Sequence, residues 1–405
     1  LVLDENGKKM SKSVGNTIDP LDLIQGVSGD ELVKKRVHGL KDPEKAPQIE
    51  KDTRKAYPDG FDAFGADALR FTLARLAGQG RNIRLSVQAV EGSRNFSTKL
   101  WNAMRFAEMN ECGAPGSVDP DAVSNPVNRW ILGELDAAGA DVTKALEEFR
   151  FNDAAGGLYK FVWNIVCDWY LELSKPMLSG DDEAVKAETR DVCGYVLDET
   201  LKLLHPFMPF VTEELWESRA PGRKDAEGFL MLTQWPGKPG ELFHDAKAAE
   251  EIEWIIGLIS EVRSVRADLG VPAGAKVPMA LIGATDETAR RADVHKDILK
   301  RLARLAELEL KDQAPKGAVS TVMGETSLSL SIAEFIDIAE EKARLDKRIV
   351  DMQKEIGGLD GRLSNQQFVA KAPPEVVEEQ KKRLADFKVS AEKLQAARAR
   401  LDDLD

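Results

Sequence analysis

Two lysines and two serines lie within five consecutive residues near the start of the sequence, Lys9-Met10-Ser11-Lys12-Ser13, and Gly15 and Asn16 follow them. Lysines three positions apart on a tight loop can surround a polyphosphate, because each ammonium group is a mobile point charge. The hydroxyls and loop amides can donate hydrogen bonds to the same phosphate oxygens. Nucleotidyl transfer depends chiefly on positioning and on neutralising the charge of the transition state. We therefore interpret residues 9–13, called the pentad below, as a candidate polyphosphate-binding loop; on composition alone, a solvated basic loop is the alternative.

The composition of the chain is that of a multidomain globular protein. Its 405 residues exceed the ~250–300 at which a single hydrophobic core stops growing, and no run approaches the ~18–20 apolar residues that span a bilayer, so we expect no membrane partner. The three cysteines form no Cys-x-x-Cys pair, and only four histidines accompany them. These residues predict neither a zinc site nor a disulfide scaffold, and free thiols favour a cytoplasmic location. The cysteines are Cys112, Cys167 and Cys193.

The net charge of −13 is unevenly distributed along the chain. Residues 1–110 carry 18 basic and 15 acidic side chains, whereas residues 111–330 carry 24 and 38. The negative excess thus lies in the middle of the chain and leaves both ends able to present basic patches. The overall charge therefore neither proves nor excludes an RNA partner.

Apolar periodicity predicts a mainly α fold. The first part mixes short strand and helix patterns around the pentad, with a strong helical pattern at 66–76. The second contains helices of about 20 residues joined by short loops, which is typical of an antiparallel bundle. The third is a Gly/Pro-rich connector and a small α+β module, and the last is a coiled-coil hairpin. The predicted boundaries of these parts are 1–90, 91–220, 221–332 and 333–405.

Within the α+β module, alternating apolar residues predict a strand at 277–282 and a hairpin that turns at Gly324-Glu325. The strands of the hairpin are expected at 319–323 and 326–332. Between the first strand and the hairpin, the pattern predicts one helix at 287–308.

The predicted helix at 92–110 has an apolar side and a basic, amide-rich side. Guanidinium and amide groups can contact phosphates and the exposed bases of a single-stranded RNA loop. The alternatives are a solvated face, or a role of Arg94 and Asn95 in cross-linking the bundle. Four tryptophans, Trp101, Trp163, Trp169 and Trp216, are expected in the bundle core. The candidate RNA-binding residues are Arg94, Asn95, Lys99, Asn102 and Arg105.

The final 75 residues contain two long apolar stripes with alternating steps of three and four. The segment Asn365–Pro374 separates them, so the sequence predicts an antiparallel coiled-coil hairpin with arms of about 45 Å. A rod of this length has little interior, so we expect it to reach a distant partner. The alternative is an intramolecular or dimerising coiled coil with a solvated charged face. Basic residues on the return helix include Lys381, Lys382, Arg383 and Lys388.

The pentad with its Gly-Asn resembles the second signature of class I aminoacyl-tRNA synthetases. Further segments are similar, in order, to the valyl-tRNA synthetase family. The tail has no cysteine, unlike the cysteine-rich zinc segment of isoleucyl enzymes, and the terminal hairpin resembles the arm characteristic of valyl enzymes. The similar segments are Asn16–Ile24, Gly65–Ala74, Gly80–Ile83, Arg94–Asn102, Cys167–Glu172 and His205–Phe210.

The resemblance implies the function of a valine–tRNA ligase, in which valine and ATP, with Mg²⁺, give valyl-adenylate and pyrophosphate, and the valyl group then passes to tRNA(Val). It implies that Lys12 and Lys9 are the catalytic lysines and bind ATP together with Ser11 and Ser13. Lys12 would stabilise the departing pyrophosphate. The anticodon bundle and the hairpin arm would bind the tRNA, the arm at its outer corner. The enzyme is expected to be a cytoplasmic monomer.

No His-Ile-Gly-His sequence occurs in the chain. The resemblance implies that this motif, most of the Rossmann fold and the editing domain belong to a portion before Leu1, and that residues 1–90 begin with the tail of the α/β catalytic domain. The chain by itself is therefore expected to be inactive in valine activation. The alternative function is a stand-alone tRNA-binding or coiled-coil interaction module without catalysis.

Overall fold

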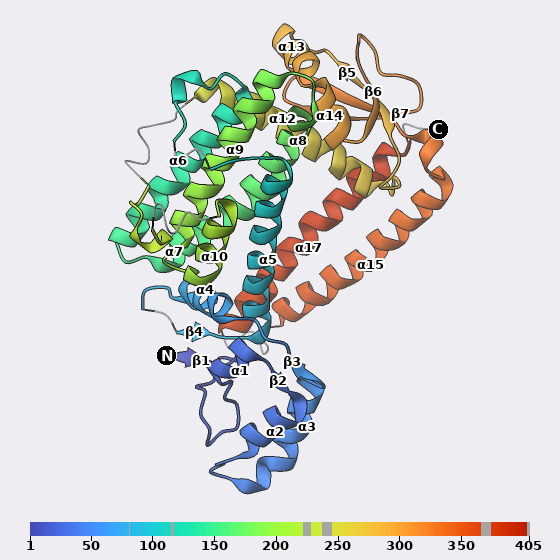
Figure 1. Ribbon diagram of the computed structural model, residues 1–405. Coiled ribbons are helices and arrows are strands. Elements are labelled where there is room, and N and C mark those ends of the chain that lie inside the picture. The colour runs from blue at the N-terminus through green and yellow to red at the C-terminus, as the bar shows by residue number, and fades with distance from the viewer. Residues whose placement is uncertain (81, 115–116, 222–227, 237–244, 366–373, 403–405) are drawn as a thin grey trace. The chain divides into compact units, whose positions relative to one another are not determined.

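The computed structural model describes most of the chain, in two compact units, Leu1–Ile252 and Glu253–Asp405 (Figure 1). The described residues are mainly helical, as predicted, with small sheets. None of their helices is both long enough and apolar enough to cross a bilayer. The described ranges are 1–80, 82–114, 117–221, 228–236, 245–365 and 374–402.

The first unit begins with short strands and helices around the pentad. Strand β1 pairs in parallel with β4, and β2 pairs antiparallel with β3. Helix α4 occupies the predicted range 66–76, and an Asp19 cap with Pro20 at the first position starts α1. The elements are β1 (Val2–Leu3), α1 (Pro20–Gln25), β2 (Val27–Ser28), α2 (Gly29–Val37), η1 (Pro43–Lys45), α3 (Ala46–Ala56), β3 (Gly60–Phe61), α4 (Ala66–Leu76) and β4 (Ile83–Arg84).

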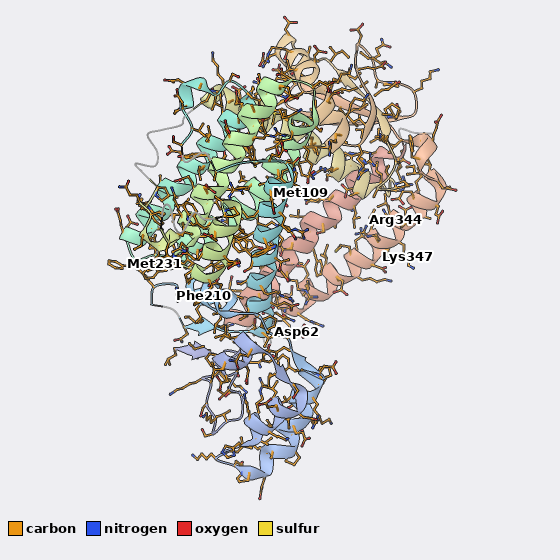
Figure 2. All side chains as sticks on the ribbon, in the orientation of Figure 1. Asp62, Met109, Phe210, Met231, Arg344 and Lys347 are labelled. Atoms are coloured by element: carbon orange, nitrogen blue, oxygen red, sulfur yellow. The ribbon has the colours of Figure 1, made fainter. Side chains whose placement is uncertain are left out.

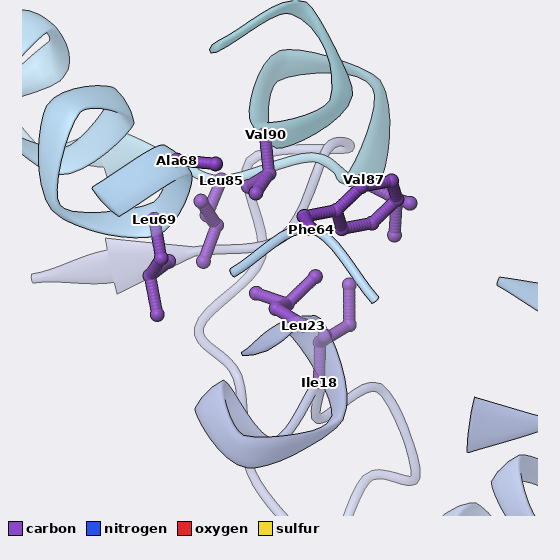
Figure 3. Packing of buried hydrophobic residues seen from close by; sticks show 8 residues of the cluster. All are labelled: Ile18, Leu23, Phe64, Ala68, Leu69, Leu85, Val87 and Val90. Carbon is purple, nitrogen blue, oxygen red and sulfur yellow. The ribbon is translucent and has the colours of Figure 1, made fainter. Parts of the chain in front are cut away.

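One apolar cluster joins these elements to the first bundle helix (Figure 3). It contains buried residues of the segment after the pentad, of α1, of α4 and of the first bundle helix, α5 (Val87–Met109). The pentad residue Met10 packs against it and so attaches the candidate loop to the core. The cluster consists of Ile18, Leu23, Phe64, Ala68, Leu69, Leu85, Val87 and Val90.

The helices that follow, as far as Arg219, form the predicted bundle; the short helix at 230–232 and the helix at 246–268 come after it, and most of the latter belongs to the second unit. Ser86 caps α5, and Asn125 with Pro126 starts α6. Between α7 and α8 the chain continues without a break through a π-helical segment, which apolar periodicity did not predict. The elements are α5 (Val87–Met109), η2 (Pro120–Ala122), α6 (Pro126–Glu147), α7 (Phe151–Lys160), η3 (Phe161–Tyr170), α8 (Leu171–Ser179), α9 (Glu183–Leu204), α10 (Pro209–Arg219), η4 (Leu230–Leu232) and α12 (Ala246–Asp268).

The expectation that all four tryptophans fill the core is wrong for Trp101, whose residue surface is 39% exposed. Trp216 is buried, and Trp163 and Trp169 are half-buried. Trp101 directly follows the fully buried Leu100, and a step of 100° is enough to carry a side chain to the edge of the apolar face.

The second unit contains a mixed sheet with the strand order β6-β5-β8-β7. The hairpin of β7 and β8 turns at Gly324, as predicted, and Met323 pairs with Thr326. The predicted helix at 287–308 is wrong in its second half: it is broken at His295, and β6 begins at Leu305. The elements are β5 (Val277–Ile282), α13 (Asp286–Val294), α14 (Lys296–Leu302), β6 (Leu305–Lys311), β7 (Ala318–Met323), β8 (Thr326–Ser331) and η5 (Ala333–Phe335).

Helices α15 (Ile338–Ser364) and α17 (Pro374–Arg400) pack against each other. Leu345 and Leu359 of α15 are buried, as are Val377 and Leu394 of α17, so the predicted stripes face inward. The predicted turn lies mostly outside the described residues. Near the base of this arm, the Arg344 guanidinium donates to the carbonyl of Asp268 at 3.1 Å; Figure 2 labels Arg344 on α15.

Candidate functional site

An aspartate and an asparagine hold the pentad in place. The Asn16 amide donates to Asp4 Oδ2 at 2.8 Å and to the carbonyl of Lys9 at 3.2 Å. Its oxygen accepts the Ser11 amide at 2.9 Å, so one side chain fixes two pentad residues. Asp4 Oδ1 also accepts the amide of Lys8 at 2.8 Å. We call this pair the Asp4–Asn16 clasp.

The surroundings of Asp4 favour the ionised form of its carboxyl group. Burial alone would raise the pKa of this carboxyl group, but hydrogen bonds from Asn16 and from the amides of Lys8 and Asn6 hold the pKa below its ordinary value. A carboxylate whose pKa is depressed by folding stabilises the folded state above its unfolded pKa of ~3.9 and loses this contribution as the pH falls through its folded pKa. The clasp is therefore fully formed at neutral pH.

The second half of the pentad is a tight turn. The hydroxyls of Ser11 and Ser13 lie 2.6 Å apart, and the Ser11 carbonyl accepts the amides of Val14 and Gly15, both at 3.1 Å. Gly15 has a φ of +77°, and a Cβ there would lie 2.9 Å from the Arg36 carbonyl. A side chain at position 15 would thus disturb the turn, which explains the glycine after the pentad.

In this arrangement the charged side chains of the pentad are exposed to solvent. Lys9, Lys12 and Ser13 are exposed, whereas Met10 is half-buried against the apolar cluster. Lys12 also lines an open cavity of about 530 Å³, together with Thr17, Asp19, Asp22, Glu31, Lys34, Lys35 and His38. The structure therefore brings the predicted phosphate-binding residues onto one loop that is fixed at its apolar residue and open at its cations.

No role for Asp4 was predicted from the sequence, and Asn16 was singled out only as part of a motif. Two features of the sequence could have revealed the clasp. An acidic residue, Asp4, comes before a turn that contains Gly7, and a side-chain amide, Asn16, follows the pentad. Both types often hydrogen-bond to nearby backbone groups.

We expect Asn16→Ala to loosen the pentad without unfolding the unit. The substitution removes hydrogen bonds to Asp4, Lys9 and Ser11, each contributing about 0.5–1.5 kcal/mol. Hydrogen exchange of the Ser11 amide should therefore accelerate at least about tenfold in NMR measurements. Asn6→Ala is the matched control, because only the Asn6 backbone contacts Asp4. Equal Ser11 exchange in wild type and Asn16→Ala would contradict the role of the clasp.

The candidate RNA-binding face of α5 is divided by the structure. Asn95, Asn102 and Arg105 are exposed. Lys99 is half-buried, pairs with Asp168 and lies 4.0 Å from the Trp163 ring centre. Lys99 thus connects α5 to the π-helical segment, a cross-link that was predicted for Arg94 and Asn95 and not for this residue.

Arg94 is also half-buried. Its guanidinium carbon lies 5.9 Å from the ring centre of Phe64, and its Nη2 lies 4.0 Å from Glu91 Oε1. Arg94 therefore faces the junction of α5 and the β3 segment, apart from the exposed amides.

The four predicted basic residues of the arm are exposed on α17. Lys381 pairs with Glu378 at 2.8 Å, and Lys388 lies 3.6 Å from Asp360 of the opposite helix. The guanidinium of Arg383 lies 5.5 Å from the ring centre of Phe387. These surface pairs are weak in water, so the cations are available to a phosphate backbone.

Three family profiles match the chain in order. The profile described as tRNA synthetases class I (I, L, M and V) matches residues 1–86, the anticodon-binding domain of tRNA ligase matches 128–281, and the valyl tRNA synthetase tRNA binding arm matches 337–402. Among solved structures, the LeuRS–tRNA–LeuAMS complex of Agrobacterium radiobacter K84 aligns with 76% of this chain and 31% of its own at 17% identity, with a TM-score of 0.40, which supports no comparison of sites.

Curated relatives align with nearly the whole chain. The valine–tRNA ligase of Caulobacter vibrioides is 47% identical over 401 residues, which is 99% of this chain and 40% of the relative. Those of Rhizobium meliloti and Agrobacterium fabrum are 44% and 45% identical over 403 residues, 38% of each relative. The chain thus spans about 40% of the length of these relatives. The collinear profiles and these identities show that the chain belongs to the valyl-tRNA synthetase family, of which it represents the C-terminal portion.

Proposed function

We propose that the chain supplies the phosphate-binding loop and the tRNA-binding surfaces of a valine–tRNA ligase. The full-length ligase activates valine with ATP and transfers the valyl group to tRNA(Val). The catalytic part of this proposal rests on one observation: Asp4 and Asn16 hold the pentad in place while its lysines are exposed. The family membership supports the rest.

In this proposal, Lys12 and Lys9 bind the phosphates of ATP, and the hydroxyls of Ser11 and Ser13 complete the loop. Adenylate formation breaks the bond between the α- and β-phosphates, so negative charge grows on the departing pyrophosphate. The Lys12 ammonium neutralises this charge more strongly in the transition state than in the ground state, which is the requirement for catalysis.

Mg²⁺ fits this loop only as part of the nucleotide. Among the described residues, no group of three or more His, Cys, Asp or Glu side chains could hold a metal ion. Mg²⁺ in nucleotide sites is commonly bound by substrate phosphates with few protein ligands. The proposed loop therefore contributes cations and hydrogen-bond donors and leaves the ion to the ATP phosphates.

For tRNA we propose two surfaces. On α5, Asn95, Asn102 and Arg105 are the exposed contacts, and Arg94 and Lys99 act from half-buried positions beside them. On the arm, the contacts are Lys381, Lys382, Arg383 and Lys388. The three free cysteines support a cytoplasmic protein, and we propose that it acts as a monomer.

The arm surface predicts a salt-dependent loss of affinity. Lys381→Gln/Lys382→Gln/Arg383→Gln should weaken tRNA binding, because each lost phosphate contact reduces the slope of log K against log salt by about 0.7–0.9. We expect the magnitude of the slope, measured by filter binding, to fall by about 2–3 if all three residues touch phosphates.

Lys347→Gln/Arg348→Gln/Lys354→Gln on α15 is the matched control, with the same charge change at exposed positions; Figure 2 labels Lys347. The control should leave the slope nearly unchanged. Equal slopes for wild type and the α17 variant would mean that this face of the arm is only a solvated coiled-coil surface.

A further inference from the structure

A second cavity lies between the β3 segment and the start of α5. Its volume is about 430 Å³, within the range of ~300–1,000 Å³ that is usual for small-ligand pockets. It does not include any residue of the pentad. We call it the β3–α5 pocket.

The apolar wall of this pocket is aromatic. Phe61 and Phe64 are stacked with ring centres 5.9 Å apart, and Tyr57 meets the edge of Phe61 at 5.8 Å. Phe64 and Val87 also belong to the buried apolar cluster (Figure 3). A planar ring is therefore the kind of ligand that this wall can pack against.

The opposing polar groups come from α5. Gln88, Glu91 and Arg94 are spaced by three residues and all line the pocket. Arg94 Nε has no hydrogen-bond partner in the protein, and Arg94 Nη2 lies 4.0 Å from Glu91 Oε1, too far for a hydrogen bond. Because Arg94 lines the pocket and its hydrogen-bonding capacity is not filled, its guanidinium can donate to an acceptor on a ligand there.

The charged side chains that line the pocket indicate whether it suits an anionic or a neutral ligand. Besides Glu91, the carboxylates of Glu5 and Asp62 line the pocket, against the single cation Arg94; Figure 2 labels Asp62, which directly follows β3. Three carboxylates and one guanidinium repel a phosphate. They favour a neutral ring that offers N–H donors as well as one acceptor edge.

Guanine has this combination. Its N1–H and N2–H lie side by side and match the two oxygens of one carboxylate, and its O6 and N7 accept from arginine. Unpaired RNA bases are commonly recognised by stacking on aromatic side chains and by hydrogen bonds to their edges.

We propose that the β3–α5 pocket binds one unpaired guanine base, with Glu91 accepting from N1–H and N2–H, Arg94 donating to O6 or N7, and the ring packed against Tyr57 and Phe61. The source of the base is RNA; this part rests on the proposed function, in which the chain binds tRNA. Free guanosine is the other source of the same chemistry.

The first experiment tests the pocket without RNA. Binding of guanosine, adenosine, cytidine and uridine to the 405-residue chain is measured by saturation-transfer NMR and titration. Guanosine should bind at least about fivefold more tightly than the other three, and Glu91→Gln should remove this preference. Glu108→Gln, an exposed glutamate of the same helix, is the matched control and should retain it. Circular dichroism verifies that both variants are folded.

The second experiment tests the source of the base. Kethoxal modifies the N1 and N2 atoms of accessible guanines, so one unpaired guanine of bound tRNA(Val) should be protected by wild type and by Glu108→Gln but not by Glu91→Gln. Filter binding is measured in parallel. Bound tRNA without Glu91-dependent protection, and no preference for guanosine, overturns the pocket while the proposed function stands. A guanosine preference without any tRNA binding overturns the RNA source and the proposed function, but not the base pocket.

Discussion

Lys12→Ala in the full-length ligase should slow valine-dependent ATP–pyrophosphate exchange at least about 100-fold. Removing one group that stabilises developing charge in a transition state typically lowers the rate 10²–10³-fold. The valine affinity should change little, because Lys12 faces the phosphates in the proposed mechanism. The loss should therefore appear in the maximal rate of exchange more than in the valine concentration at half-maximal rate.

The control for this prediction is Lys8→Ala, which removes another exposed lysine from the segment just before the pentad. It should leave the exchange rate within about twofold, since its side chain has no part in the proposed phosphate contacts. An unchanged exchange rate in Lys12→Ala would refute the assignment of Lys12. An equal loss in both variants would mean that the total positive charge of the loop matters and not the position of Lys12.

The helical elements could be predicted because their apolar periodicity is long. Helix α4 matches its predicted range, and the arm helices bury the residues that the stripes indicated, such as Leu345 and Leu394. Sustained patterns of this kind specify a buried face independently of tertiary context. The hairpin of β7 and β8 could also be predicted, because Gly324-Glu325 is a turn signal between two runs of alternating apolar and polar residues.

The errors occurred where local pattern and tertiary pairing disagree. Leu305 and Leu308 fit the helical spacing of residues 287–308, yet they lie on β6, which pairs in parallel with β5. The pairing partner is about 30 residues away in sequence, and such long-range pairing overrides the weak preference of a short segment. Arg304, just before this strand, adopts a φ of +54°, which is incompatible with a continuing α-helix. The spacing of apolar residues does not predict this backbone conformation.

For the candidate site, the residues that could bind phosphate were predicted from the sequence, but the contacts that hold them in place were not. The pentad was found from its lysines and hydroxyls, whereas the clasp depends on Asp4 and Asn16, twelve residues apart, meeting at 2.8 Å. The basic face of α5 was found as a whole, but its division into exposed Asn102 and bridging Lys99 depends on Asp168, which lies on another helix. Residue types predict which interactions are possible, and only the packing of helices selects among them.

A buried ion pair connects α10 to α9 in the bundle. Arg219 Nε donates to Asp198 Oδ1 at 2.6 Å, and their side chains are only 3% and 4% exposed. The guanidinium also donates to the carbonyls of Gly113 and Gly194 at 2.7 and 3.1 Å. One arginine of α10 thus binds a carboxylate and a carbonyl of α9 and a carbonyl of the loop at Gly113.

We expect Asp198→Ala to destabilise the bundle by about 3–5 kcal/mol, because it leaves the Arg219 charge buried without its counter-ion. Arg219→Ala should have a similar effect, since it removes this counter-charge from the buried Asp198 carboxylate. Hydrogen–deuterium exchange of α9 and α10, together with thermal unfolding, measures both losses. Arg54→Ala, which removes a solvent-exposed ion pair with Asp30, is the control and should leave the unfolding temperature unchanged.

The double variant Asp198→Ala/Arg219→Ala distinguishes a coupled pair from two independent contacts. Residues that share a hydrogen-bonded ion pair show coupling of about 0.5–3 kcal/mol, so the double variant should be more stable than the sum of the single losses predicts. The reason is that the second substitution removes the very charge that the first one left unpaired. Strict additivity of the two losses would show that each residue stabilises the bundle through packing or backbone contacts alone, and the ion pair would then not be the connection between α9 and α10.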